Sequence, residues 1–180
     1  MIVTFITSNK DKAEHLANNL GLRIEHRNLD ITEIQSLSLE EIVKDKAQKA
    51  YEIIKSPVLV EDASLKYTAF GNLPGPLIKW FHKELGNSGL CRIINHYKKD
   101  RTALSEVLFC LYDGKEFKLF AGSKAGRIAA YPRGEMGYGW DAVFIPDGSN
   151  KTRAEMDEDE RFESSMRKEA LEKLREYLAK

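Results

Sequence analysis

The chain has 180 residues, of which 42% are hydrophobic and 31% are charged, and 28 Lys and Arg residues balance 28 Asp and Glu residues. A chain of this length suits one domain, or one domain with a lobe, and the composition is that of an ordinary globular protein. The balanced charge argues against nucleic acid as a partner, and no apolar run approaches the roughly 20 residues that a membrane helix needs.

The start of the chain and its two cysteines bear on the compartment. Residues 1–7 lead directly into strand-like sequence, without a basic n-region or a small-residue cleavage site. Cys91 and Cys110 stand in apolar surroundings and have no partner at metal-binding spacing. We therefore expect two buried free thiols and a cytoplasmic location.

The first predicted elements are a strand, a helix and a second strand. Residues 1–7 are apolar and β-branched, which is typical of a buried strand. Residues 8–20 carry an apolar stripe at helical spacing, and Gly21 supplies the stop. Residues 22–26 alternate and predict a second strand.

A further helix is predicted behind Ser38. Ser38 and Glu41 make a capping box, in which the two side chains satisfy amides at the helix start reciprocally. A buried strand follows at residues 57–60 and is expected to end in Glu61 and Asp62. The apolar positions of the helix are Leu39, Ile42, Val43, Ala47, Ala50, Ile53 and Ile54.

The remaining elements alternate between helices and strands. In chain order they are a Gly/Pro loop at 71–76, helices at about 77–85 and 88–97, strands at 103–112, 116–121 and 142–146, a capped helix start at Asp157 with Glu160, and a helix at 165–178. Asp113 and Gly114 between two of the strands are a strong hairpin signal. This order predicts an α/β protein with a mixed central β-sheet flanked by helices, in a single domain of residues 1–180 whose middle section can form a second lobe.

Two segments are candidates for phosphate and metal binding. Segment 7–12 (TSNKDK) stands where a strand ends and a helix begins, so free amides, hydroxyls and lysines can bind an anion there. The alternative is an N-cap followed by solvated lysines. Asp62, with Glu33 from an earlier loop, offers the oxygen ligands that Mg²⁺ uses. Alternatively these acids meet solvent, and since neighbours on a strand point to opposite faces, one of Glu61 and Asp62 is expected to do so.

Two later segments are candidates for recognising a base. Segment 137–141 (GYGWD) places two aromatic rings between glycines, where stacking on a base contributes about 1–3 kcal/mol. A tight loop pinned by a buried tryptophan is an equally good interpretation. Segments 151–155 (KTRAE) and 164–167 (SSMR) are polar and cationic and place donors before the last helix, although a solvated helix is the usual meaning of such charge.

Together and in this order, the motifs resemble those of the inosine triphosphate pyrophosphatase (Ham1-like) family over nearly the whole chain. Segment 7–12 matches the family's Thr-x-Asn-x-x-Lys, and residues 60–62 and 71–76 match its acidic strand end and Pro-Gly loop. Segment 137–141 matches its aromatic–Gly–aromatic–Asp signature, and 151–155 its Lys-Thr-x-Ala-Glu.

The resemblance implies a fold of two lobes with a nucleotide cleft between them, assembled as a homodimer. It also implies hydrolysis of non-standard purine (deoxy)nucleoside triphosphates, those of inosine, deoxyinosine and xanthosine, to the monophosphate and pyrophosphate, with Mg²⁺ as cofactor. Such an enzyme cleanses the nucleotide pool.

The same resemblance assigns roles to residues. Glu33 and Asp62 are expected to bind Mg²⁺, and Asp62, assisted by Lys12 and Glu33, to orient the attacking water. The triphosphate contacts are expected from Thr7, Ser8, Asn9, Lys12, Lys46 and Arg161. The nucleoside contacts are expected from Tyr138, Gly139, Trp140, Asp141, Ser165 and Arg167.

Arg167 carries the expected base selectivity. Its guanidinium offers only N–H donors, which suit the 6-oxo group of hypoxanthine or xanthine. Adenine presents an amino group there, so a donor would be left unpaired at a cost of about 1–3 kcal/mol, or roughly ten- to a hundredfold.

The chain also departs from the family pattern. Met166 stands where His is usual, Arg161 where Lys is usual, Ala142 where Pro is usual and Phe162 where Asn is usual. Two alternative functions follow. One is a Maf-like nucleotide pyrophosphatase that prefers other bases. The other is a nucleotide-binding protein without turnover, its base reader weakened by Met166.

Overall fold

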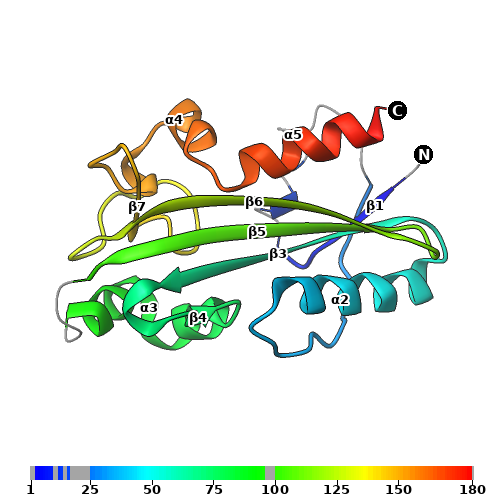
Figure 1. Ribbon diagram of the computed structural model, residues 1–180, viewed down its shortest axis with the longest axis horizontal. Coiled ribbons are helices and arrows are strands. Elements are labelled where there is room, and N and C mark those ends of the chain that lie inside the picture. Colours follow the sequence, from blue (N-terminus) through cyan, green and yellow to red (C-terminus); the bar gives the residue numbers. More distant parts are fainter. Residues whose placement is uncertain (1–2, 10–11, 14–15, 17–24, 96–99, 180) are drawn as a thin grey trace. The chain divides into compact units, whose positions relative to one another are not determined.

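The structure is a computed structural model that describes residues 3–9, 12–13, 16, 25–95 and 100–179 (Figure 1). The chain forms two compact units. Unit 1 comprises Met1–Ala63, Val107–Gly122 and Glu169–Lys180, and unit 2 comprises Ser64–Glu106 and Ser123–Lys168. Three strands, β3, β5 and β6, pass from one unit into the other, so each unit is built from non-consecutive segments.

Among the described residues, unit 1 contains a sheet with helices on both faces. Its elements are β1 (Thr4–Ile6), β2 (Glu25–Arg27), α2 (Leu39–Ile54), the first part of β3 (Val58–Tyr67), parts of β5 (Thr102–Tyr112) and β6 (Phe117–Ile128), and most of α5 (Arg167–Leu178). β1 pairs in parallel with β2 and with β3, so that Phe5 lies opposite His26 on one side and Leu59 on the other. α2 covers one face of this sheet and α5 the other (Figure 1).

One buried cluster of unit 1 lies between α2 and the sheet. Val43, Ala47 and Ala50 of α2 are fully buried against Val58 and Val60 of β3. Burying a large aliphatic side chain contributes about 1.5–3 kcal/mol, so this face of the helix holds it on the sheet. Ile53, predicted to share that face, is 58% exposed, and this part of the prediction is wrong because Ile53 points away from the buried stripe.

Unit 2 is built on the remaining parts of β3, β5 and β6. Its other elements are η1 (Thr68–Phe70), β4 (Pro74–Gly75), α3 (Ile78–Asn95), β7 (Phe144–Pro146), η2 (Arg153–Glu155) and α4 (Glu158–Glu163). β4 pairs antiparallel with β3, and β7 antiparallel with β6, where Ile145 lies opposite Arg127. The strand order is β2–β1–β3–β5–β6–β7, with β4 beside β3, so the predicted mixed α/β sheet is confirmed.

The core of unit 2 packs α3 against the strands. Leu90, Cys91 and Ile94 of α3 lie in one buried cluster with Tyr67 and Phe144. α3 is broken at Gly86, where the backbone is left-handed, with φ 62° and ψ 179°. The two helices predicted on either side of this position are therefore confirmed, with a tight join.

The start of α2 differs in detail from the prediction. The Ser38 hydroxyl accepts from the amide of Glu41 at 3.3 Å, as expected of an N-cap. The Glu41 carboxylate does not return to the Ser38 amide. It accepts a hydrogen bond from the Ser36 hydroxyl at 2.6 Å, and the Ser36 oxygen accepts from the Ser38 amide at 3.0 Å. Ser36 thus stands between the Glu41 carboxylate and the Ser38 amide, which are in direct contact in a standard capping box.

The other boundaries follow the prediction with two exceptions. The hairpin around Asp113 and the capping box of Asp157 with Glu160 are confirmed. The exceptions are two strands that were predicted too short: β3 does not end at Asp62 but continues to Tyr67, and β6 does not end at residue 121 but continues to Ile128. Of the predicted helix at 8–20, residues 12, 13 and 16 are helical, and most of the rest, with Gly21 and residues 22–24, lies outside the described residues.

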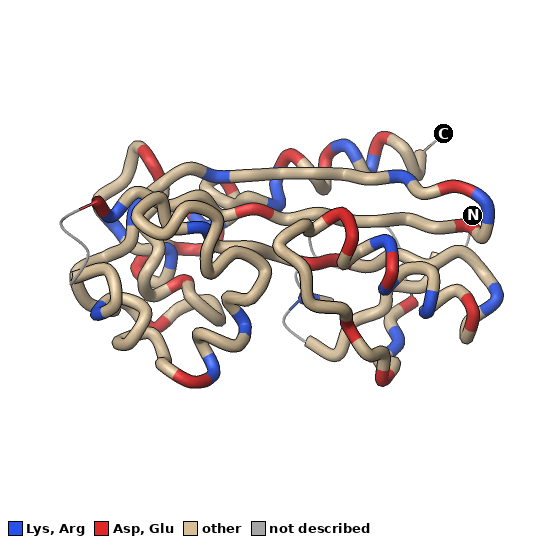
Figure 2. The backbone as a smooth tube through the Cα atoms, turned by 60° about the horizontal axis from the view of Figure 1, so that its bottom comes forward, with Lys and Arg blue, Asp and Glu red and all other residues tan. Residues whose placement is uncertain are grey.

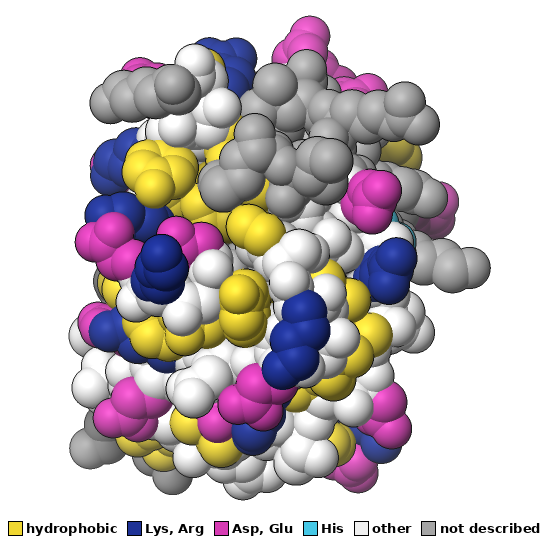
Figure 3. Space-filling view, turned by 90° about the vertical axis from the view of Figure 1, so that its right-hand side faces the viewer, with side chains coloured by type: hydrophobic (Ala, Val, Ile, Leu, Met, Phe, Trp, Pro, Cys, Tyr) yellow, Lys and Arg dark blue, Asp and Glu magenta, His cyan; other side chains and the backbone are white. Residues whose placement is uncertain are grey.

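The surface carries both signs of charge throughout. Figure 2 shows lysines and arginines interspersed with acidic residues along the backbone of each unit. On the face in Figure 3, hydrophobic side chains likewise lie among charged ones of both signs. Within the part of the chain that the structure describes, no helix has the length and apolar character required to cross a membrane.

Candidate functional site

The predicted site residues fall into two groups, one on each unit. The group on unit 1, which we call the carboxylate–lysine cluster, consists of Lys12, Glu33, Lys46, Glu61 and Asp62. The group on unit 2, which we call the arginine network, consists of Ser105, Tyr138, Asp141, Arg153, Arg161, Ser164, Ser165, Met166 and Arg167.

β3 positions two acids of the carboxylate–lysine cluster at consecutive residues. Glu61 is 2% exposed, and its Oε1 lies 3.2 Å from Nζ of Lys12. Asp62 is half-buried, so of the two neighbours Asp62 is the one that partly meets solvent. The ion pair with Lys12 allows Glu61 to be buried inside a strand that continues past it.

Asp62 lies in the field of three charged side chains. Burial raises the pKa of the Asp62 carboxyl above its ordinary value of 3.8, while Lys12 and Lys46 lower it in part and Glu33 adds a smaller increase. Glu33 also pairs with Lys46, with Oε1 and Nζ 2.5 Å apart. The structure thus brings together Lys12, Glu33, Lys46 and Asp62, four residues that the sequence placed in one site.

The segment before Lys12 forms a cap at the end of β1. The Thr7 hydroxyl accepts from the Asn9 amide at 3.1 Å, and the Asn9 side-chain oxygen accepts from the Lys12 amide at 3.2 Å. This is the N-cap that the sequence offered as an alternative to anion binding. Lys12, however, is not a solvated lysine, since its side chain is 17% exposed and paired with Glu61. Ser8 is exposed beside them.

Glu33 and Asp62 are the two carboxylates of this cluster that could bind a metal ion. Among the residues described, no three His, Cys, Asp or Glu side chains come together in a way that could hold a metal ion. Glu33 and Asp62 do offer oxygen donors, and Mg²⁺ uses few protein carboxylates and completes its shell with water and phosphate oxygens. The burial that destabilises the Asp62 anion would be offset by a nearby cation, so the donor set fits such an ion.

Segment 137–141 is a tight loop closed by its own carboxylate. Asp141 Oδ2 accepts from the Tyr138 amide at 3.2 Å, and Asp141 Oδ1 lies 2.8 Å from Nε of Arg153. Gly137 has φ 77°, and a Cβ there would meet Asp141 Oδ2 at 2.2 Å, so only glycine fits. Both oxygens of Asp141, a predicted nucleoside contact, are engaged in holding the loop.

The two aromatic rings of this loop have different surroundings. Trp140 packs against the core of unit 2, as in the interpretation of a loop pinned by tryptophan. Tyr138 is half-buried, and the guanidinium carbon of Arg167 lies 5.9 Å from the centre of its ring. Gly139 is exposed, and its carbonyl accepts from the Asn87 side chain at 3.1 Å. Tyr138 is therefore the ring of this loop that lies next to a guanidinium.

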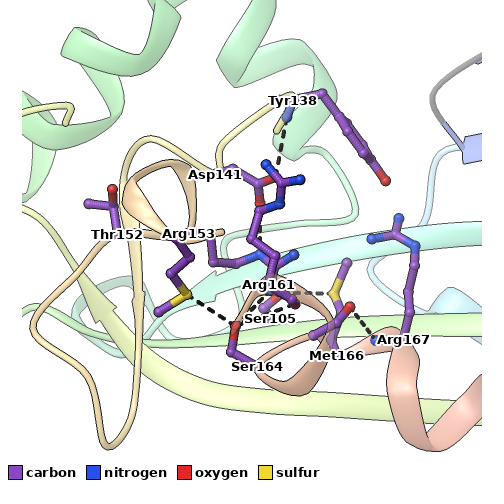
Figure 4. A network of polar contacts seen from close by, with 12 residues as sticks. Ser105, Tyr138, Asp141, Thr152, Arg153, Arg161, Ser164, Met166 and Arg167 are labelled. Carbon is purple, nitrogen blue, oxygen red and sulfur yellow. Dashed lines mark hydrogen bonds and ion pairs between the residues drawn. The ribbon is translucent and has the colours of Figure 1, made fainter. Parts of the chain in front are cut away.

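The turn before α5 contains the predicted base readers (Figure 4). Ser165 and Arg167 are 6% and 7% exposed, and the Ser165 hydroxyl accepts from the Arg167 amide at 3.1 Å. Met166 is 6% exposed, and its sulfur accepts a hydrogen bond from the Ser105 hydroxyl at 2.7 Å. The residue at the family's His position is thus anchored on β5. Arg161 is half-buried, and its buried Nη1 has no hydrogen-bond partner among the described residues.

Three contributions to these groups were not predicted from the sequence. Arg153 joins the 137–141 loop to the turn, Ser105 anchors Met166, and Glu61 pairs with Lys12. Each contact joins residues that are distant in sequence, or involves a position that no motif specifies. No local sequence pattern therefore indicates these contacts. In contrast, Thr152 and Glu155 form a capping box at the start of η2, which gives two fixed positions of the 151–155 motif a structural role.

Comparisons with known proteins identify the family of this chain. The family model described as Ham1 family matches residues 3–177. Inosine triphosphate pyrophosphatase 2 of Trypanosoma cruzi is 42% identical over 179 residues, covering 97% of this chain and 91% of that protein. The inosine triphosphate pyrophosphatase of Schizosaccharomyces pombe is 41% identical over 179 residues, covering 98% and 94%.

A solved structure supports the fold. The HAM1 protein from Coxiella burnetii superposes with a TM-score of 0.85 over 99% of each chain, at 24% identity. On the family match across nearly the whole sequence, and on relatives well above 30% identity, this chain belongs to the Ham1 family.

Proposed function

We propose that this protein is a nucleoside triphosphate pyrophosphatase. It hydrolyses non-standard purine (deoxy)nucleoside triphosphates, those of inosine, deoxyinosine and xanthosine, to the monophosphate and pyrophosphate. The observation that carries the proposal is Asp62, a half-buried carboxylate flanked by Glu33, Lys12 and Lys46, in a chain whose relatives are named inosine triphosphate pyrophosphatases.

In this proposal the carboxylate–lysine cluster handles the phosphates. Glu33 and Asp62 would hold Mg²⁺, which when bound supplies positive charge to the phosphate oxygens. Lys12 and Lys46 neutralise charge that develops on the departing pyrophosphate. The donors of Thr7, Ser8 and Asn9 orient the triphosphate, together with Arg161.

Asp62 orients the attacking water and accepts its proton as the oxygen bonds to the α-phosphorus. The bond from the α-phosphorus to the bridging oxygen breaks, and pyrophosphate leaves. Lys12, Lys46 and a Mg²⁺ ion held beside Asp62 would favour its ionised carboxylate, which is the form that accepts the proton.

The arginine network recognises the purine. Tyr138 provides a stacking surface, and the N–H groups of Arg167 meet the 6-oxo group of the base, assisted by Ser165. Asp141, Gly139 and Trp140 shape the loop that carries Tyr138.

The proposal is tested with Asp62→Asn. The substitution preserves the size of the side chain and removes the proton acceptor, so we expect kcat for pyrophosphate release from inosine triphosphate to fall by about 10²–10⁴-fold. Asp45→Asn is the matched control, because Asp45 lies on α2, pairs with Lys49 at 2.7 Å and is outside the cluster. If Asp62→Asn has a normal circular dichroism spectrum and keeps activity within a few-fold of the unmodified protein, Asp62 is not the proton acceptor.

We also propose a homodimer in the cytoplasm with Mg²⁺ as the working ion. Two free, buried cysteines support a reducing compartment. Trp80 of α3 is 47% exposed, which supports α3 as a contact surface in the dimer. Sedimentation velocity on the purified protein tests the dimer, and activity in chelator with each divalent ion added back tests the metal.

A further inference from the structure

Arg153 links two segments of unit 2 that belong to the predicted base site. Its Nε lies 2.8 Å from Asp141 Oδ1, in the 137–141 loop. Its Nη1 donates to the Arg161 carbonyl at 2.8 Å and to the Ser164 hydroxyl at 3.1 Å, at the turn before α5. Figure 4 shows the guanidinium between the two segments.

The bridge needs a guanidinium. The Arg153 and Asp141 side chains are 13% and 14% exposed, so the pair is largely desolvated and loss of one partner leaves a buried charge unpaired. The planar fork of arginine presents separate N–H groups to Asp141 on one side and to Arg161 and Ser164 on the other. A lysine ammonium can keep the charge but has no such fork.

The two joined segments carry Tyr138 and Arg167. Tyr138 is three residues before Asp141, and the Tyr138 amide donates to the same carboxylate that Arg153 holds. Ser164 begins the turn in which the Ser165 hydroxyl accepts from the Arg167 amide at 3.1 Å. Without the bridge, the loop and the turn lose the shared anchor that keeps the Arg167 guanidinium 5.9 Å from the Tyr138 ring.

We propose that Arg153 is a positioning residue that sets the geometry of base recognition, holding the Tyr138 ring and the Arg167 guanidinium in register. The inference rests on the proposed function, because the base is the ligand that this geometry serves. It adds a residue at the one position of the 151–155 motif that the family pattern leaves open.

The test is the ratio of kcat/KM for inosine triphosphate to kcat/KM for adenosine triphosphate. We expect Arg153→Ala to lower this ratio about fivefold or more, since misplacing a single donor forfeits part of a discrimination of roughly ten- to a hundredfold. The decrease in kcat/KM for inosine triphosphate should come mainly from a higher KM, because Arg153 contacts a region remote from the reacting phosphate. Arg153→Lys should give an intermediate ratio.

Arg127→Ala is the matched control. Arg127 is also half-buried and also bridges segments of unit 2, donating to the Ser149 carbonyl at 3.1 Å and to the Asn150 side chain at 3.0 Å. It should lower the melting temperature as Arg153→Ala does while leaving the base ratio within about twofold, because a loss of stability alone does not favour one base over another.

The outcomes separate the inference from the proposed function. Absence of pyrophosphate release from inosine triphosphate by the unmodified protein overturns both. If the unmodified protein is active and both Arg153 variants keep its base ratio, the inference alone is overturned. If Arg153→Ala does not fold, the inference is tested with Arg153→Lys alone. A ratio of kcat/KM values in Arg153→Lys equal to that of the unmodified protein would show that base recognition does not require the guanidinium, and would overturn the inference.

Discussion

Arg167 is a buried donor whose guanidinium lies against an aromatic ring. It is 7% exposed and lies 5.9 Å from the centre of the Tyr138 ring. A planar cation that already rests on an aromatic ring is ordered before a ligand arrives, which reduces the entropy lost on binding. An ordered donor of this kind is what the proposed role of Arg167 in base recognition requires.

Truncation of Arg167 should weaken selectivity more than turnover. In Arg167→Ala no N–H group meets the 6-oxo position, so we expect the preference for inosine over adenosine triphosphate to fall by roughly ten- to a hundredfold. Steady-state kinetics with both nucleotides measure it. An unchanged preference would mean that another group reads the base.

Met166, which stands where the family pattern has histidine, has a structural role. The side chain is buried, with its sulfur bonded to Ser105 of β5. A thioether is a weak acceptor with no proton to donate, so in the proposed site the hydrogen bonds from this turn to a base would come from Ser165 and Arg167. The sequence predicted that this position has no hydrogen-bond donor, but it did not predict the contact between Met166 and Ser105.

The two cysteines should be inert in the folded protein. Burial raises the pKa of Cys91 to about 11 and that of Cys110 to about 12, from an ordinary value of 9.0. Because the thiolate is the reactive form, two pKa units reduce its population about a hundredfold below pH 9. We expect an aromatic disulfide reagent at pH 7.5 to titrate both thiols only after denaturation. Rapid reaction of either thiol in the native protein contradicts this expectation.

At the scale of elements, local patterns predicted most of the fold. α2 and the halves of α3 follow from apolar residues at helical spacing, and the hairpin of β5 and β6 follows from Asp113 and Gly114. β3 was predicted too short because two adjacent acids resemble a strand end. The ion pair of Glu61 with Lys12, which lets the strand continue, joins residues far apart in the chain.

The 137–141 loop is held in its conformation by contacts with the Asp141 carboxylate. We expect Gly137→Ala to destabilise the protein by about 1–3 kcal/mol, because a Cβ adds strain at positive φ and collides with the Asp141 carboxylate. Gly139→Ala is the matched control, since Gly139 also has positive φ, 61°, but nothing lies within 4 Å of its Cβ position. Equal shifts of the melting temperature in the two variants would show that the Asp141 contact does not constrain the loop.

At the scale of the whole molecule, the sequence predicted the fold class, the order of elements and a second lobe built on the middle section, but not where the two units begin and end. The units are built from non-consecutive segments, and three strands contribute to both. Such long-range organisation has no local signature. The candidate catalytic residues lie on unit 1, and the residues proposed to bind the base lie on unit 2. The motifs that together predict one function are therefore divided between the two units.

The most direct test of the central claim is a panel of nucleoside triphosphates with Mg²⁺, in which chromatography separates monophosphate and pyrophosphate from diphosphate and phosphate. We predict rapid release of pyrophosphate from inosine, deoxyinosine and xanthosine triphosphates, with adenosine triphosphate slower by at least about tenfold. Preference for a different base, release of phosphate in place of pyrophosphate, or binding without turnover would contradict the account.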